Sequence, residues 1–515
     1  MRKILLGTTA VVGLALVAQA ANAQQARPAA RPAPAAAPAA PPPLPATSVA
    51  PTGTAAAIFQ TPVGITGAGP HGADGIPNRP TTPTTSGIVV RLGGFFDFSM
   101  GNVSDSSDGA FFRNNMAPLS ANSTTGVISG TALTSAKGRQ RNDFRTEAEL
   151  NVYADGIAAN GMRYGAVFEL QMDNVTSPSG QGSGTGLDYD ELYGFVKGGW
   201  GELRFGQEDT AASLMQVRRP SVLWMGTDDA WDEFTVNQPG GTPYVMSGMN
   251  DGNDATKIIY LSPQFAGFDV GVSYAPNMFE GENFLNPTST TAFQRDFTGL
   301  TNQITGALRY RGTFGDIGVA TSFVASFADA PKSAANGTDL INKPQNVSAY
   351  SAGLVVRAYG FSVGGEYTWG NYNGSAPGQA ALNKGLDGSN HWVGSGTYTI
   401  GAFSIGAMYG KGNQDNGTAS AQLGQTAGAA LEDREQTYLG FGVAYVLAPG
   451  MTLFANYNQI QDKNIPLAGA SVNSAGTGAV AAGAAGAGTT LAKFDSSGST
   501  TRDITVLVAG VRVAF

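Results

Sequence analysis

Residues 162–173 read MRYGAVFELQMD, and every second side chain in this stretch is apolar. Val167 is the single large apolar residue among the alternate positions, which otherwise carry charged residues, glycine and glutamine. Successive side chains of a strand point to opposite faces, so this period of two predicts a β-strand with one apolar face. The apolar parity consists of Met162, Tyr164, Ala166, Phe168, Leu170 and Met172.

The same alternation recurs from residue 88 to the C-terminus, clearly in 144–152 and in 361–369. Short connections rich in Gly and Pro alternate with long polar loops, which is the organisation of a transmembrane β-barrel with short periplasmic turns and long extracellular loops. We therefore predict an all-β fold, a 16-stranded antiparallel barrel. The predicted strands are 88–100, 144–153, 162–172, 190–197, 201–207, 256–261, 268–275, 303–311, 316–327, 348–358, 361–370, 391–400, 402–410, 435–446, 451–461 and 502–515.

Aromatic residues favour a membrane barrel over a soluble sandwich, because they collect at the strand ends on the apolar face. Phe361 and Trp369 are eight residues apart, which corresponds to roughly 20 Å of height in a tilted strand, close to the apolar band of an outer membrane. We expect two aromatic girdles at the lipid–water interfaces. They comprise Tyr164, Phe268, Tyr310, Phe361, Phe403, Tyr445 and Phe515 at the short-turn end, and Tyr274, Phe327, Trp369, Tyr409 and Tyr457 at the long-loop end.

The opposite face of the strands is too polar for a dry core. Burying so many charges costs several kcal/mol each unless they are paired, so the pattern predicts a water-filled lumen. The residues expected to face it are Arg145, Glu147, Glu149, Asn151, Arg163, Glu169, Gln171, Arg204, Asp269, Ser273, Arg309, Arg357, Glu366 and Arg512.

The N-terminus predicts export. Arg2 and Lys3 precede an apolar stretch, and Ala21-Asn22-Ala23 fits a cleavage site, so residues 1–23 are a predicted signal peptide. Residues 24–86 are rich in Ala and Pro, and we expect a disordered periplasmic tether that is also a candidate for contact with the cell wall. Residues 87–515 form the predicted barrel, which places the protein in the outer membrane.

Composition excludes several classes of protein. The chain has no cysteine and two histidines, His71 and His391, which leaves out disulfide frameworks and Cys-based metal clusters. The net charge of -8 argues against nucleic-acid binding. We therefore name no catalytic, cofactor-binding or metal-binding residue.

Several motifs resemble the general porins of Gram-negative outer membranes. They are RLGGFFD at 91–97, ELYGFV at 191–196 with GELRFGQ at 201–207, IYLSPQFAGF at 259–268, and the C-terminal VRVAF at 511–515. The resemblance implies a homotrimer in outer-membrane lipids and lipopolysaccharide that passes ions and small hydrophilic solutes by passive diffusion. It also implies that Phe515 is an assembly signal for the barrel-assembly machinery.

In that family the long loop after the fifth strand folds into the lumen, which here corresponds to residues 208–255. The resemblance thus predicts a constriction where loop acids face wall arginines, and the acidic balance predicts a mild cation preference. The alternative is that these acids form a solvated face of the loop. The predicted constriction residues are Asp228, Asp229, Asp232 and Glu233, opposite Arg145, Arg163 and Arg204.

Three other functions are alternatives to a diffusion channel. A substrate-specific channel would use inward aromatic rings, of which the predicted registers offer only Phe95, Tyr438 and Phe454. A structural or adhesive barrel would favour long repetitive loops over a polar lumen. An outer-membrane enzyme would need a partner for His391 and Ser395, which share a strand face, and the sequence offers no third member. We expect a diffusion channel and no enzyme.

Overall fold

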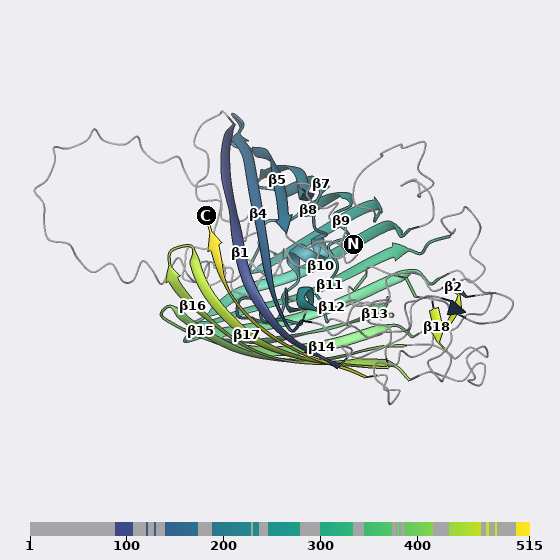
Figure 1. The fold of residues 1–515 in the computed structure, drawn as a ribbon. Helices are drawn as coiled ribbons and strands as arrows, with labels where there is room; N and C mark the ends of the chain where they lie inside the picture. The colour runs from purple at the N-terminus through teal and green to yellow at the C-terminus, as the bar shows by residue number, and fades with distance from the viewer. Residues whose placement is uncertain are drawn as a thin grey trace, which may run out of the picture.

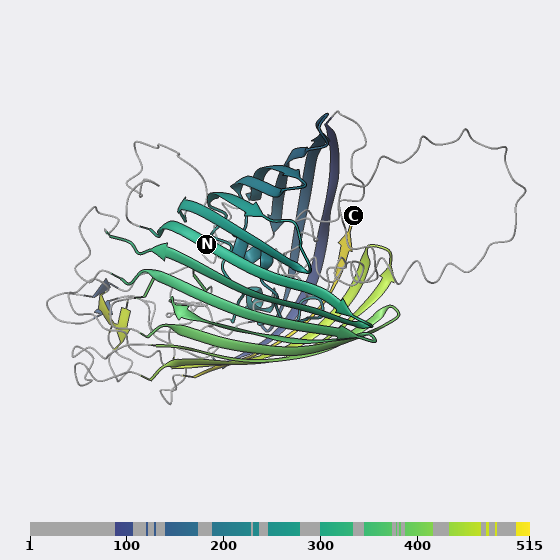
Figure 2. The same ribbon diagram turned by 180° about the vertical axis from the view of Figure 1, so that it is seen from behind.

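Sixteen antiparallel strands form one closed barrel in the computed structural model (Figures 1 and 2). The structure describes residues 88–106, 120–121, 128–129, 140–173, 188–227, 230–235, 246–278, 299–332, 344–372, 377–378, 381–382, 387–415, 432–464, 470–472, 479–481 and 501–515. The predicted signal peptide and the whole of the predicted tether lie outside these residues. None of the helices in the described part of the chain is long and apolar enough to span a membrane.

The barrel strands follow one another in chain order around the wall. They are β1 (Val89–Asp105), β4 (Asn142–Ile157), β5 (Arg163–Asp173), β6 (Asp188–Gly198), β7 (Gly201–Gln207), β8 (Thr256–Leu261), β9 (Phe268–Asn277), β10 (Thr301–Phe314), β11 (Ile317–Asp329), β12 (Val347–Ala358), β13 (Phe361–Asn371), β14 (Ser389–Ile400), β15 (Phe403–Gln414), β16 (Arg434–Ala448), β17 (Met451–Lys463) and β20 (Arg502–Ala514).

The first and last strands close the barrel. β1 pairs with β20 from Phe95 opposite Ala514 to Asp105 opposite Ile504, and with β4 on its other side. The backbone of Phe515 also exchanges hydrogen bonds with that of Gly94. Closure gives every wall strand a partner on both sides, which satisfies the backbone donors and acceptors that hydrocarbon would leave unpaired.

The predicted fold class is confirmed, and each of the sixteen predicted strands corresponds to a wall strand. The observed strands are often longer: β1 continues past residue 100 because Gly101 and Asn102 still pair with Asp143 and Asn142 of β4. Four short elements inside predicted loops were not anticipated. They form two hairpins, β2 (Ser120–Ala121) with β3 (Ile128–Ser129), and β18 (Ala470–Val472) with β19 (Ala479–Ala481).

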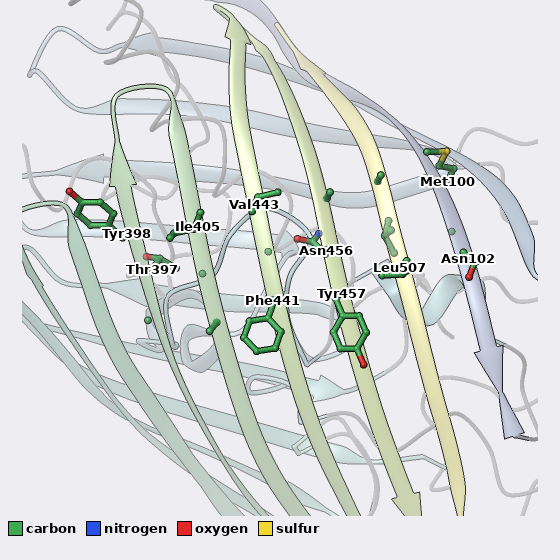
Figure 3. Close-up of a pocket in the computed structure, with 18 of the residues that line it drawn as sticks. Met100, Asn102, Thr397, Tyr398, Ile405, Phe441, Val443, Asn456, Tyr457 and Leu507 are labelled. Atoms are coloured by element: carbon green, nitrogen blue, oxygen red, sulfur yellow. The ribbon is translucent and has the colours of Figure 1, made fainter.

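The outer face of the wall is apolar and rich in aromatic rings. Phe268 packs against Tyr310 at one strand end, and Trp392 packs against Tyr409 toward the other. Residues of β1, β4, β13–β17 and β20 also line an apolar depression, in which Phe441 lies beside Tyr457 (Figure 3). Such a surface is stable only against lipid or another apolar surface.

The inner face carries buried ion pairs that join neighbouring strands. Arg512 donates to Asp97 across the β1–β20 seam, with Nε 2.7 Å from Oδ1, and Arg502 pairs with Asp105 along the same seam. Pairing within the wall lowers the cost of burying these charges, which counting ionisable residues in the sequence does not reveal.

Part of the inner wall is apolar, and of its members only Tyr438 and Phe454 are among the residues predicted to face inward. The buried apolar side chains there belong to β14–β17 and β20, and they pack against residues 222–225 and Trp231 of the loop between β7 and β8. A covered patch of inner wall needs no polar residues, because the loop excludes water from it. Its members are Val393, Met408, Tyr438, Phe454, Ile460, Ile504, Val506 and Val508.

Candidate functional site

The loop between β7 and β8 lies against the inner face of the barrel. We refer to its described residues, 208–227, 230–235 and 246–255, as the inward segment. It begins with the short helix α4 (Ala211–Met215), whose N-cap Thr210 accepts a hydrogen bond from the backbone N–H of Ser213. The N–H groups of Ala211 and Ala212 donate to inward hydroxyls of the wall, Ser273 on β9 and Thr305 on β10. The helix terminus is thus satisfied by the wall itself.

Beyond α4 the inward segment follows the wall from β11 to β14. The N–H of Val217 donates to Ser322 Oγ on β11 at 2.6 Å. The guanidinium of Arg219 donates to Glu366 on β13 at 2.7 Å, and Ser395 on β14 donates to the carbonyl of Pro220. These hydrogen bonds fix successive residues of the segment to successive strands.

Gly353 on β12 makes the close approach between wall and segment possible. A Cβ at this position would lie 1.7 Å from the carbonyl oxygen of Val217, which no real side chain could tolerate. The missing side chain therefore determines how near to β12 the segment can run.

Trp224 anchors the segment near the barrel seam. Its side chain is 1% exposed and stacks on Phe454 of β17 with ring centroids 5.8 Å apart. The guanidinium carbons of Arg145 on β4 and Arg512 on β20 lie 5.3 Å and 5.7 Å from its ring centroid, within cation–π range. Its φ of 65° is unusual for a bulky residue, which is consistent with tight packing holding the backbone there. The apolar run VLWM at 222–225, inside a predicted loop, was the available signal in the sequence.

The acids predicted for the constriction are only partly described. Asp228 and Asp229 lie outside the described residues. Asp232 and Glu233 belong to the 3₁₀ helix η4 (Ala230–Phe234), where Asp232 is half-buried and the side chain of Glu233 lies outside the described atoms. The carbonyl of Asp232 accepts a hydrogen bond from the N–H of Thr235 at 2.9 Å.

The three predicted arginines do not form one ring. Arg145 pairs with Glu147 at 2.9 Å, near the end of β4 that pairs with Asp173. Arg163 is opposite Ile157, at the other end of the β4–β5 hairpin. We therefore correct the expectation that these residues meet at a single constriction. Parity along a strand tells which face a side chain is on, but it gives no height along the barrel.

Each of these arginines has its own carboxylate neighbours. Arg163 lies 3.6 Å from Asp155 beside the short turn. Arg204 on β7 is fully buried between Glu202 at 2.8 Å and Glu208 at 2.9 Å. Arg204 therefore holds the start of the inward segment to the wall.

Two arginines of the segment itself were missed. Arg218 and Arg219 both pair with the predicted lumen residue Glu366, at 3.6 Å and 2.7 Å. Arg219 also donates to Thr227 Oγ1 at 2.7 Å, within the segment. The Arg-Arg-Pro sequence at 218–220 was the available signal, because adjacent arginines in an inward loop need nearby acids.

The other predicted wall residues lie on the inner face. Glu147, Glu149, Glu169 and Arg512 are buried, whereas Arg357 is half-buried at the short-turn end of β12. His391 is buried on the inner face of β14, two residues before Val393 on the same face. The hydroxyl of Ser395, on the same face, donates to the inward segment as described above.

More aromatic rings face inward than the three predicted from the sequence, Phe95, Tyr438 and Phe454. Tyr153, Tyr193 and Phe195 form a buried cluster with Val167 on β4–β6. The guanidinium carbon of Arg204 lies 5.2 Å from the centroid of Tyr193. All three rings lie inside the predicted strands 144–153 and 190–197, and Tyr153 has the same parity as the predicted lumen residue Asn151.

Comparisons with known proteins find one family. The profile of the family described as Gram-negative porin matches residues 8–465. No curated protein sequence matches the chain. The chain is similar in structure to the anion-selective porin from Comamonas acidovorans, with 14% identity and a TM-score of 0.44 over 83% of this chain and 100% of that one. It is also similar to the outer membrane channel DcaP of Acinetobacter baumannii, with 12% identity and a TM-score of 0.46 over 84% and 99%.

Proposed function

The chain belongs to the family of Gram-negative porins and forms a diffusion channel in the outer membrane, and we propose that the inward segment narrows this channel. Transport is passive, and solutes are selected by size where the segment reduces the free cross-section. The supporting observation is a row of hydrogen bonds between the segment and the wall. These bonds join residues 211–223 of the segment with inward groups on β9, β10, β11, β13, β14 and β17.

The narrowing is static in this proposal. Each buried hydrogen bond contributes roughly 1 kcal/mol, and the apolar side chains of residues 222–225 cover an apolar patch of wall. Moving the segment away would expose both surfaces together. The segment therefore acts as a fixed restriction rather than as a lid.

Charge on opposite walls biases the passage of ions. Carboxylates of β4–β6, the buried Glu149 and Glu169 and the half-buried Asp190, lie within 4.8 Å of one another. Arg218 and Arg219 lie at β13, several strands away around the barrel. We assign to this arrangement a transverse field that orients dipolar solutes, and a mild preference for cations from the excess of acids.

Planar bilayers provide the test. The refolded protein without residues 1–23 should open in discrete steps, and a salt gradient should give a reversal potential of the sign expected for cations. Silence from protein that circular dichroism shows to be folded would contradict the channel. A reversal potential of the opposite sign would contradict only the assigned charge preference.

A substrate-specific channel is the second candidate, although the inward rings of Tyr153, Tyr193 and Phe195 are buried against Val167 and do not favour it. Aromatic rings along a lumen offer stacking surfaces to sugars. Swelling of liposomes in sugars of equal mass separates the two candidates. A diffusion channel should admit them at equal rates, whereas a specific channel should prefer one.

Processing and assembly complete the proposal. Residues 1–23 are removed on export, and residues 24–86 act as a periplasmic tether with the cell wall as a candidate contact. The barrel assembles as a homotrimer in outer-membrane lipids and lipopolysaccharide, after the barrel-assembly machinery has recognised Phe515. We propose no catalytic activity and no cofactor, since the hydroxyl of Ser395 is engaged in holding the inward segment.

A further inference from the structure

Three carboxylates converge where the inward segment leaves the wall and returns to it. Asp209 comes at the start of the segment, and Asp251 and Asp254 come at its end. All three are buried, and one oxygen from each lies within 4.8 Å of the others. The N–H of Thr210 donates to the carbonyl of Asp251 at 2.8 Å, which holds the two ends of the segment together. The local backbone is built for this convergence, since Asp254 has a φ of 46°.

One basic residue acts on the buried carboxyls of the cluster. Lys257 is the basic residue whose charge acts on both Asp251 and Asp254, and its Nζ donates to the carbonyl of Glu208. Burial raises the pKa of Asp251 to about 8, and the charge of Asp209 adds to the effect. Burial and the charge of Asp251 likewise raise the pKa of Asp254 well above its usual range. Burial thus disfavours charge on these carboxyls unless a cation neutralises it.

A fourth oxygen, Oε1 of Gln303 on the barrel wall, lies beside Gly252 of the inward segment. Gln303 on β10 is 1% exposed, and its Nε2 donates weakly to Ser326 Oγ at 3.5 Å. Its Oε1 is buried without a hydrogen-bond partner, and it lies 2.7 Å from the position that a Cβ on Gly252 would take. Gly252 stands between Asp251 and Asp254 in the chain, so this amide oxygen lies beside the turn that carries both carboxylates. A buried acceptor with no donor is costly unless something else satisfies it.

We propose that Asp209, Asp251, Asp254 and Gln303 Oε1 bind one hard divalent cation. The donor set is entirely oxygen, which hard cations of the Ca²⁺ type prefer. Two oxygens on one Ca²⁺ are separated by at most about 5 Å, because each bond is about 2.4 Å long. The separations among the three carboxylates satisfy this limit.

A cation here would join both ends of the inward segment to β10. Asp209 and Asp251 belong to opposite ends of the segment, and Gln303 belongs to the wall. The bound ion would therefore stabilise the position of the segment from its base, far from the Trp224 anchor. This role goes beyond the proposed channel function and does not depend on it.

The test uses Ca²⁺ as the probe, with the mature protein refolded in detergent, free of lipopolysaccharide and treated with chelator. Calorimetric titration should give one saturable site per chain, and Ca²⁺ should raise the midpoint of thermal unfolding. Asp251→Asn and Asp254→Asn should each weaken binding at least about tenfold. Asp316→Asn, which removes the same charge from an exposed turn, should bind as the wild type does.

Gln303→Leu separates the site from general electrostatic attraction. It removes the amide oxygen without changing charge, and it should also weaken binding about tenfold. The Asn variants should fold at least as well as the wild type in chelator, because they relieve repulsion between buried charges. The proposal is overturned if the wild type shows no saturable site, or if Asp316→Asn weakens binding as much as Asp251→Asn does. Because these measurements need no conduction, a failed channel would leave their outcome unaffected.

Discussion

At the scale of single residues, Trp224 is the main anchor of the inward segment. Its ring contacts side chains on β4, β17 and β20, which are the strands around the barrel seam. Large aromatic side chains contribute most of the packing energy wherever they are fully buried. The position of the segment in the lumen should therefore depend strongly on this residue.

Trp224→Ala should destabilise the segment by about 3 kcal/mol, the usual cost of removing a buried aromatic ring. We expect a higher and noisier single-channel conductance, because the segment loses its hold near β17. Trp200→Ala is the matched control, since Trp200 is exposed and stacks on Tyr260 at a turn outside the lumen. An unchanged conductance in Trp224→Ala would show that the segment does not restrict the channel.

The pairing of Arg219 with Glu366 should control both stability and ion preference. Arg219→Ala removes the 2.7 Å ion pair with the buried carboxylate of Glu366, which keeps Arg218 at 3.6 Å and the backbone N–H of residue 219 at 3.3 Å, and it should cost about 3 kcal/mol. The reversal potential should indicate a stronger preference for cations in Arg219→Ala and a stronger preference for anions in Glu366→Gln. A shift in the same direction for both variants would indicate collapse of the segment instead of an effect of charge.

An exposed ion pair provides the comparison. Lys411 and Glu435 are 3.2 Å apart, with side chains 42% and 40% exposed. Exposed pairs contribute at most about 1 kcal/mol. Lys411→Ala should therefore change neither the unfolding midpoint nor the reversal potential appreciably.

At the scale of elements, the distance between the inward segment and β12 depends on Gly353. Gly353→Ala would force the new methyl group into the carbonyl of Val217. Such overpacking costs roughly 1–3 kcal/mol of stability. Here the segment must move away from the wall to make room for the methyl group. We expect a lower thermal midpoint together with an altered conductance.

Gly306→Ala is the control for that variant. Gly306 lies on β10, and a Cβ there would meet no atom within 4 Å. Its substitution should leave conductance unchanged and should not lower stability measurably. Equal effects from the two glycine variants would contradict the assigned contact between β12 and the segment.

The elements themselves were predictable to different degrees. The sixteen wall strands were predicted because period-two alternation is a local property of each strand. The hairpins β2–β3 and β18–β19 were not, because Gly-, Ala- and Ser-rich stretches carry no such alternation. Helix α4 is five residues long and is capped partly by wall hydroxyls, so no periodicity could indicate it.

At the scale of the whole molecule, the barrel closes without the predicted tether. The pairing of β1 with β4 begins at Val89 opposite Asp155, and its pairing with β20 begins at Phe95. Deletion of residues 24–86 should therefore leave folding and conductance unchanged, as heat-dependent gel mobility and bilayer recordings would measure. Failure of the deleted protein to refold would show that the tether takes part in forming the barrel.

The sequence alone determined the strands, the two faces of each and the membrane in which they lie, because these follow from local alternation and from the need to satisfy every backbone group. It did not determine which charges meet. Arg145 and Arg163 share a face but lie at opposite ends of one hairpin. Asp209 and Asp251 lie at opposite ends of a long segment but converge within 4.8 Å. Parity in a strand fixes direction, whereas height, register and the path of the inward segment arise only when the whole barrel closes around it.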